Sequence, residues 1–156
     1  MPAAYSPDTI GFLIVDVARL LRAEFDRRTG GAGLGLTPAE ARTLSNVART
    51  GPVRQSVLAE RMGVEAMTLS ACLDRLEAHG LARRAPDPFD RRAKLVDITE
   101  AAGPVLDEIF AVSAALREDM TRDVAADRVE EFRQTLMTIR ARLVAMRPDC
   151  RGSASQ

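Results

Sequence analysis

Two adjacent arginines are the side chains of this sequence best suited to bind an anionic partner. Arg91 and Arg92 lie in the stretch DPFDRRAKLVDIT, residues 87–99. Alternating apolar and polar residues predict strands at residues 81–85 and 94–98, so both arginines are expected at the tip of a β-hairpin. A guanidinium group on a rigid turn loses little conformational entropy when it binds. The hairpin tip is therefore a candidate binding site.

Two short helices are predicted directly before this hairpin. Residues 55–63 and 64–80 each end in a glycine placed to terminate a helix, and the second segment carries an apolar stripe. A short helix, a turn and a longer helix are the spacing of a helix-turn-helix. The capping box TPAE, residues 37–40, predicts the start of one more helix. Residues 36–98 are thus expected to form a three-helix lobe with a two-stranded β wing.

The second helix of the pair, expected over residues 65–79, has the size to enter the major groove of DNA, which is about 12 Å wide. Its exposed face is expected to comprise Ala66, Met67, Thr68, Ser70, Ala71 and Asp74. The hydroxyl groups of Thr68 and Ser70 can meet a phosphate or a base edge. Met67 and Ala71 can contact a thymine methyl group.

The hairpin tip is expected to contact the other groove of the duplex. The minor groove of A·T-rich DNA is narrow and strongly negative, which attracts an inserted arginine. Arg92 is expected to enter it with Arg91 alongside, while Asp90 bonds Arg92 or a neighbour and fixes its direction. Arg75 is expected to reach a phosphate or to pair with Asp90. Paired arginines alone are commonly a solvated surface, so this interpretation depends on the adjoining helix-turn-helix.

Long amphipathic helices are predicted on both sides of this lobe. Apolar residues recur with helical spacing in residues 10–25 and 106–124. From Val129 to Met146 the apolar spacing is 3, 4, 3, 4, 3, which is a heptad seam. Because so small a core cannot bury all these stripes, we expect a homodimer, although packing of the seam within one subunit remains an alternative.

These patterns predict a mainly α (α+β) fold, a winged helix-turn-helix flanked by N- and C-terminal dimerisation helices. The expected division is an N-terminal dimerisation helix in 1–35, the DNA-binding lobe in 36–98, C-terminal dimerisation helices in 99–147 and a disordered tail in 148–156.

Composition excludes several classes of function. The chain has 156 residues with 22 basic and 22 acidic side chains, so only the local charge distribution bears on nucleic acid. Neither a transmembrane run nor a signal-like N-terminus is present, so a cytoplasmic protein without membrane contact is expected. Cys72 and Cys150 are far apart and form no metal-binding motif. With no paired carboxylates, activated nucleophile or phosphate-binding loop, no enzyme, catalytic residue, metal or cofactor is expected.

Residues 36–109 resemble the MarR family of winged helix-turn-helix transcriptional regulators. The resemblance rests on LAERMGV, LDRLEAHGL, DPFDRRAKLVDIT and EAAG. It implies a homodimer that binds a near-palindromic operator in double-stranded DNA, usually as a repressor, often released by a small aromatic or phenolic ligand or by oxidation. It matches residues 65–79 to the helix that enters the major groove, and Asp90 and Arg92 to the Asp-x-Arg of the wing tip.

Several positions depart from the family pattern. Glu65 replaces the common Ser or Thr cap, Ala71 stands where many members carry a basic residue, and Arg54 replaces the usual Thr. The first helix has no cysteine, so the thiol switch of peroxide-sensing members is not expected. The absence of a basic side chain at Ala71 leaves an alternative open. The protein would then be a winged-helix dimer that acts as a protein-interaction module without DNA binding. Ligand-binding residues stay unknown, with the first helix and Phe110 as candidate lining of an effector pocket.

Overall fold

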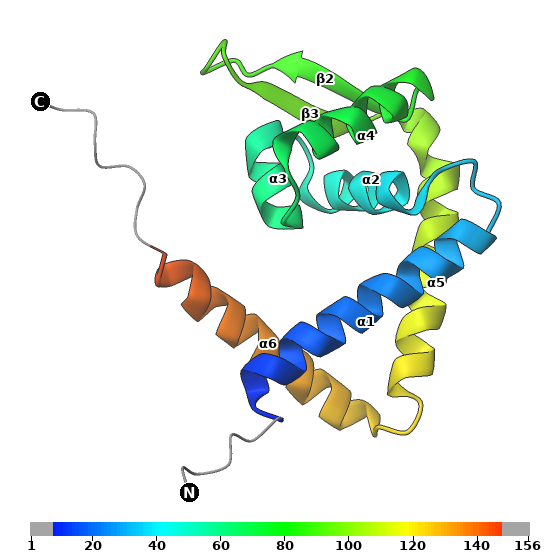
Figure 1. Cartoon of the computed structure of the whole chain (residues 1–156), viewed down its shortest axis with the longest axis vertical. Helices are drawn as coiled ribbons and strands as arrows, with labels where there is room; N and C mark the ends of the chain where they lie inside the picture. Colours follow the sequence, from blue (N-terminus) through cyan, green and yellow to red (C-terminus); the bar gives the residue numbers. More distant parts are fainter. Residues whose placement is uncertain (1–7, 148–156) are drawn as a thin grey trace, which may run out of the picture. The chain divides into compact units, whose positions relative to one another are not determined.

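The computed structural model describes residues 8–147 of the chain (Figure 1). The chain divides into two compact units, Met1–Leu116 and Arg117–Gln156. The tail predicted in 148–156 lies outside the described residues. The elements in chain order are α1 (Ile10–Gly31), α2 (Pro38–Thr50), β1 (Val53–Arg54), α3 (Gln55–Met62), α4 (Ala66–Ala78), β2 (Ala82–Pro86), β3 (Lys94–Ile98), the 3-10 helix η1 (Glu100–Ala102), α5 (Gly103–Thr121) and α6 (Ala126–Ala145).

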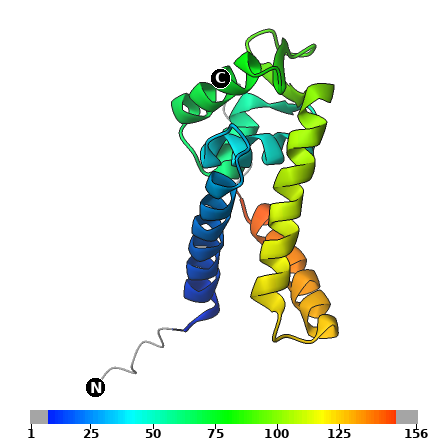
Figure 2. The ribbon, with the colours of Figure 1, turned by 90° about the vertical axis from the view of Figure 1, so that its right-hand side faces the viewer.

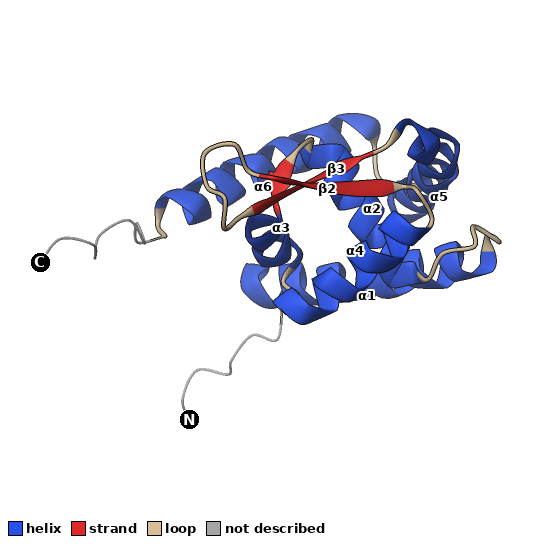
Figure 3. Cartoon of the chain, turned by 90° about the horizontal axis from the view of Figure 1, so that it is seen from above, coloured by secondary structure: helices blue, strands red, loops and turns tan. Residues whose placement is uncertain are grey.

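The predicted hairpin is present, and a short third strand extends it into a sheet (Figure 3). The strand order is β1-β3-β2 and both pairings are antiparallel. Strands β2 and β3 pair from Ala82↔Ile98 to Pro86↔Lys94. The sequence predicted no more than a connector or a single bridge before α3, whereas Val53 and Arg54 both pair with β3. The fold is therefore the predicted winged helix-turn-helix, with β1 added at the free edge of β3.

The core of the unit Met1–Leu116 joins α2, α3, α4, the sheet and the start of α5. Its side chains come from positions with helical or alternating spacing, as expected for elements that bury one face. The large apolar side chains with the least exposed surface are Leu44, Val47, Leu58, Leu69, Leu73, Leu76, Val96 and Ile109. Because α4 and the wing strand β3 share this core, the helix and the wing are held in a fixed relation.

The turn between α3 and α4 has the geometry of a helix-ending glycine motif. Gly63 takes a left-handed conformation with φ 62° and ψ 40°, which favours a residue without a Cβ atom. The N–H of Val64 donates to the carbonyl of Ala59 at 3.1 Å, and the N–H of Gly63 donates to Glu60 at 3.1 Å. These bonds end α3 and redirect the chain into α4.

Helix α1 extends away from α2, α3 and α4 (Figure 2). Most of its apolar side chains are exposed. Phe12 is 63% exposed and Leu20 is 57% exposed, and Thr29 is the only buried residue of α1. In the unit Arg117–Gln156, no residue of α6 is buried, and Phe132 on its heptad seam is 58% exposed. No helix within residues 8–147 combines the length and the hydropathy needed to cross a bilayer.

Candidate nucleic-acid interface

Helix α4 presents one buried face and one solvent face. Leu69, Cys72, Leu73 and Leu76 are buried in the core. The side chains predicted to meet DNA lie on the other side of the helix. Ala66, Met67, Thr68 and Ala71 are exposed and Ser70 is half-buried, with Met67 86% exposed. Helix α4 thus offers a surface of hydroxyl, methyl and thioether groups.

Arg75 connects α4 to the start of α2. Its Nε pairs with the carboxylate of Glu40, which is itself only 3% exposed. The same carboxylate accepts the N–H of Thr37 at 2.8 Å, completing the predicted capping box. The sequence analysis predicted that Arg75 binds a phosphate or pairs with Asp90. In the structure Arg75 pairs with Glu40 instead. A contact with phosphate stays a prediction, since the Arg75 side chain is 58% exposed.

Asp87 fixes the base of the wing tip. Its Oδ1 accepts the N–H of Phe89 at 2.8 Å, and its Oδ2 accepts Nε of Arg54 at 2.5 Å. Its backbone N–H donates to the carbonyl of Ala93 at 3.0 Å. The Phe89 N–H, with help from Arg54, holds the pKa of Asp87 below its ordinary value despite burial. The carboxylate is therefore the form that the wing tip requires.

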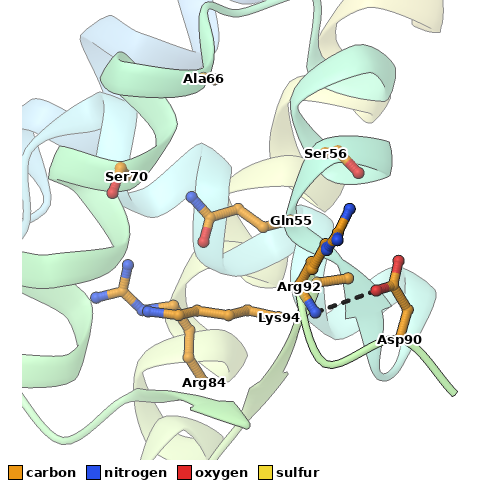
Figure 4. A pocket seen from close by; sticks show the side chains of 9 residues that line it. Gln55, Ser56, Ala66, Ser70, Arg84, Asp90, Arg92 and Lys94 are labelled. Carbon is orange, nitrogen blue, oxygen red and sulfur yellow. Dashed lines mark hydrogen bonds between the residues drawn. The ribbon is translucent and has the colours of Figure 1, made fainter. Parts of the chain in front are cut away.

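Asp90 orders the second half of the wing tip. Its Oδ1 accepts the backbone N–H of Arg92 at 3.1 Å, as the dashed line in Figure 4 marks. Its carbonyl accepts the N–H of Ala93 at 2.9 Å. The sequence predicted a bond from Asp90 to Arg92 or a neighbour, and the bond observed goes to the Arg92 backbone. The guanidinium groups of Arg91 and Arg92 are exposed on this turn.

Arg84 ties the wing to α4. Its Nε donates to Oε2 of Glu77 at 2.9 Å, and its guanidinium also pairs with Asp74. The bond with Glu77 raises the pKa of Arg84 and lowers that of Glu77. The Arg84 side chain is only 15% exposed, so its pair with Glu77 is largely shielded from solvent, whereas Asp74 is 62% exposed. Sequence reasoning missed it because the three residues lie on a helix and a strand, where spacing alone indicates no contact.

An open cleft of about 440 Å³ separates α4 from the wing (Figure 4). Figure 4 shows Ser70 and Ala66 of α4 on one side, facing Arg92 and Asp90 of the wing on the other. Three cationic side chains and one carboxylate line it, so the cleft suits an anionic partner. Its lining comprises Gln55, Ser56, Ala66, Ser70, Arg84, Asp90, Arg92, Ala93 and Lys94.

The described residues contain no cluster of three or more His, Cys, Asp and Glu side chains able to hold a metal ion. Cys72 is a free, buried thiol. Cys150 lies outside the described residues.

Comparison with known proteins identifies the family. The MarR family model matches residues 34–93, which span the end of the loop after α1 through the wing tip. The transcriptional regulator PA3341 is 35% identical, with a TM-score of 0.73 over 88% of this chain and 99% of that one.

Two further solved structures carry the family name. A MarR family transcriptional regulator from Rhodococcus sp. RHA1 is 26% identical, with a TM-score of 0.73 over 88% of this chain and 96% of that one. A structure of MarR is 25% identical, with a TM-score of 0.76 over 92% and 97% of the two chains. The chain is therefore a transcriptional regulator of the MarR family.

Proposed function

We propose that this regulator binds double-stranded DNA through α4 in the major groove and the wing tip in the minor groove. The observation that carries the proposal is geometric. Ala66 and Ser70 of α4 and the exposed Arg92 of the wing border one cleft of one lobe. Arg84 links the wing to α4, and Arg54 links the wing tip to β1.

Each predicted residue has a role in this proposal. Thr68 and Ser70 donate to phosphates or base edges, and Ala66, Met67 and Ala71 contact thymine methyl groups and neighbouring base edges. Arg92 enters the minor groove with Arg91 at its rim, while Asp90 holds the Arg92 backbone. Arg75 contacts a DNA phosphate while its guanidinium group stays paired with Glu40.

The proposed DNA-binding species is a homodimer on a near-palindromic operator. Residues 1–35 and 99–147 are assigned to dimerisation and 36–98 to DNA binding. The exposed apolar side chains of α1 and of α6 support this assignment, because apolar surface on this scale marks an interaction site. Two copies of α4 would then read two half-sites of the same sequence.

We infer that the dimer acts in the cytoplasm as a repressor released by a small aromatic or phenolic effector. This part of the proposal rests on the resemblance to the MarR family. An effector near α1 and Phe110 would act by favouring one spacing of the two DNA-binding lobes over another. The alternative of a protein-interaction module rested on Ala71, and neither the fold nor the relatives favour it.

A gel-shift titration with the DNA upstream of the protein's own gene tests the proposal. At about 0.15 M salt, the wild-type dimer is expected to retard this DNA below micromolar concentration and to resist unrelated competitor DNA. Arg92→Ala should weaken binding and lower the slope of log K against log salt by about one. The variant brings one fewer cationic side chain to the DNA, so one fewer counterion is released on binding.

Arg83→Ala is the matched control for this titration. Arg83 is a wing arginine on the face of β2 opposite to Arg84, where it pairs with Asp97 at 2.7 Å. Its removal should leave affinity and salt slope nearly unchanged. Absence of retardation at micromolar wild-type dimer would overturn the proposed function.

A further inference from the structure

Phe89 is the most exposed large apolar side chain in the described part of the chain. Its ring is 93% exposed, at the wing tip, two residues before Arg91 and three before Arg92. It takes no part in the core that holds the lobe together. The stability of the monomer therefore gives no reason for a phenylalanine at this position.

The exposure of Phe89 does not come from a loosely held loop. Its backbone N–H is bound at 2.8 Å by the carboxylate of Asp87, which is 4% exposed and paired with Arg54. The next residue, Asp90, donates its N–H to the Asp87 carbonyl at 3.3 Å. Hydrogen bonds on both sides thus fix the backbone that carries the ring, and the hairpin that bears it projects from the lobe (Figure 1).

The neighbours of Phe89 indicate the partner. An exposed apolar ring on the same short turn as two exposed arginines fits a surface that is negative overall but has apolar parts within reach. The minor groove has this character, since phosphates border it while sugars and base steps form its interior. Proteins that bind there frequently insert an apolar wedge such as phenylalanine between base steps.

We propose that Phe89 is an apolar minor-groove wedge that acts beside Arg92. The ring presses into a base step and selects steps that unstack easily, which are the pyrimidine–purine steps TA and CA/TG. This inference rests on the proposed DNA binding and adds a source of sequence preference that makes no hydrogen bond to a base. Arg91 and Arg92 supply the salt-dependent part of the affinity, and Phe89 supplies a salt-independent part.

The test compares Phe89→Ala, Phe89→Leu and Arg92→Ala on one operator over a range of salt concentrations. Phe89→Ala should weaken binding about tenfold, because the complex no longer buries an apolar ring against the DNA. The factor should be the same at every salt concentration, because the substitution removes no charge. Its slope against log salt should equal that of the wild type, whereas Arg92→Ala should lower the slope by about one. Phe89→Leu should keep most of the affinity, and melting curves should not change.

A second measurement locates the wedge. 2-Aminopurine placed at the base step under the wing tip should brighten when wild-type protein binds and stay dim with Phe89→Ala. Replacing that step by a stiff A-tract should lower the affinity of the wild type relative to that of Phe89→Ala, because both proteins keep Arg92 and only the wild type keeps the ring.

The outcomes separate the two proposals. If the wild type binds and Phe89→Ala binds equally well, or keeps the same step preference, the wedge is overturned while DNA binding stands. If Phe89→Ala lowers the salt slope as Arg92→Ala does, the wedge is overturned as well. If the wild type binds no DNA, the proposed function itself fails.

Discussion

At the scale of single residues, the geometry of the wing tip depends on Asp87 more than on the arginines that it presents. One carboxylate binds the Phe89 N–H and the Arg54 guanidinium, and the same residue closes the hairpin against Ala93. A buried carboxylate with such partners favours its charged form. The wing is therefore ordered by a group that titrates.

Asp87→Asn should destabilise the protein at neutral pH because the amide offers Arg54 no charge. The pKa of Asp87 in the folded protein lies below its ordinary value of 3.8. Its carboxylate therefore contributes stability above that value, and the contribution is lost as the pH falls through the folded pKa. Urea unfolding at several pH values should show a stability gap between wild type and variant that is constant near neutrality and shrinks in acid.

Asp107→Asn provides the control for this comparison, because Asp107 is exposed on α5. Its difference from the wild type should be small at every pH. A gap for Asp87→Asn that stays the same at pH 3 and pH 7 would contradict the role given to the carboxylate.

Local sequence predicted the turn that presents the wing arginines but not the contacts that hold this turn in place. Asp90, Arg91 and Arg92 are placed by a turn motif seven residues long, which the sequence shows directly. The pair of Arg54 with Asp87 joins residues 33 positions apart. No periodicity encodes such a pair, because it depends on how the tertiary fold brings β1 to the wing.

At the scale of elements, α4 separates stability from recognition by its two faces. Leu73 is fully buried, whereas Met67 is 86% exposed on the opposite side. A helix with this division can change the side chains of its exposed face without repacking its core.

Leu73→Ala should lower the free energy of unfolding by about 2–5 kcal/mol, since it leaves a cavity in the core. Met67→Ala should change that free energy by less than about 0.5 kcal/mol, yet should weaken operator binding. Urea unfolding and gel shifts on the same two variants provide both readouts. A destabilised Met67→Ala, or a stable Leu73→Ala, would show that the faces of α4 have been assigned the wrong way round.

Element boundaries could be predicted closely where local rules decide them. Residues 65–79 were predicted as a helix, and α4 spans Ala66–Ala78 because the apolar period and a terminal glycine are both local signals. The strand predicted at 94–98 coincides with β3, Lys94–Ile98. Strand β1 could not be predicted, since two residues acquire strand geometry only by pairing with β3.

At the scale of the whole molecule, the unexplained feature is the apolar surface of α1 and α6. The Val129 to Met146 seam is exposed or half-buried along its length. The proposed homodimer gives this surface a partner. Which copy of which helix it meets could not be predicted from the sequence, because a heptad pattern does not identify its partner helix.

Sedimentation equilibrium should find the wild type as a dimer at micromolar concentration. Phe132→Glu introduces a carboxylate into the seam and should weaken the dimer at least about tenfold, because a buried, unpaired charge is costly. Ala141→Glu adds the same charge to α6 outside the seam and should leave the dimer intact. A monomeric wild type, or equal effects of both variants, would contradict the assignment of the seam.

The most direct test of DNA binding by paired lobes is a hydroxyl-radical footprint of the wild-type protein on its own upstream DNA. Two helix-turn-helix lobes should protect two inverted half-sites with centres about one helical turn, roughly 34–36 Å, apart. Protection of the minor groove should appear on the outer side of each half-site, where the wing tip with Arg92 is expected to bind. Cleavage that remains uniform along the DNA at saturating protein, or protection without this phasing, would contradict the account.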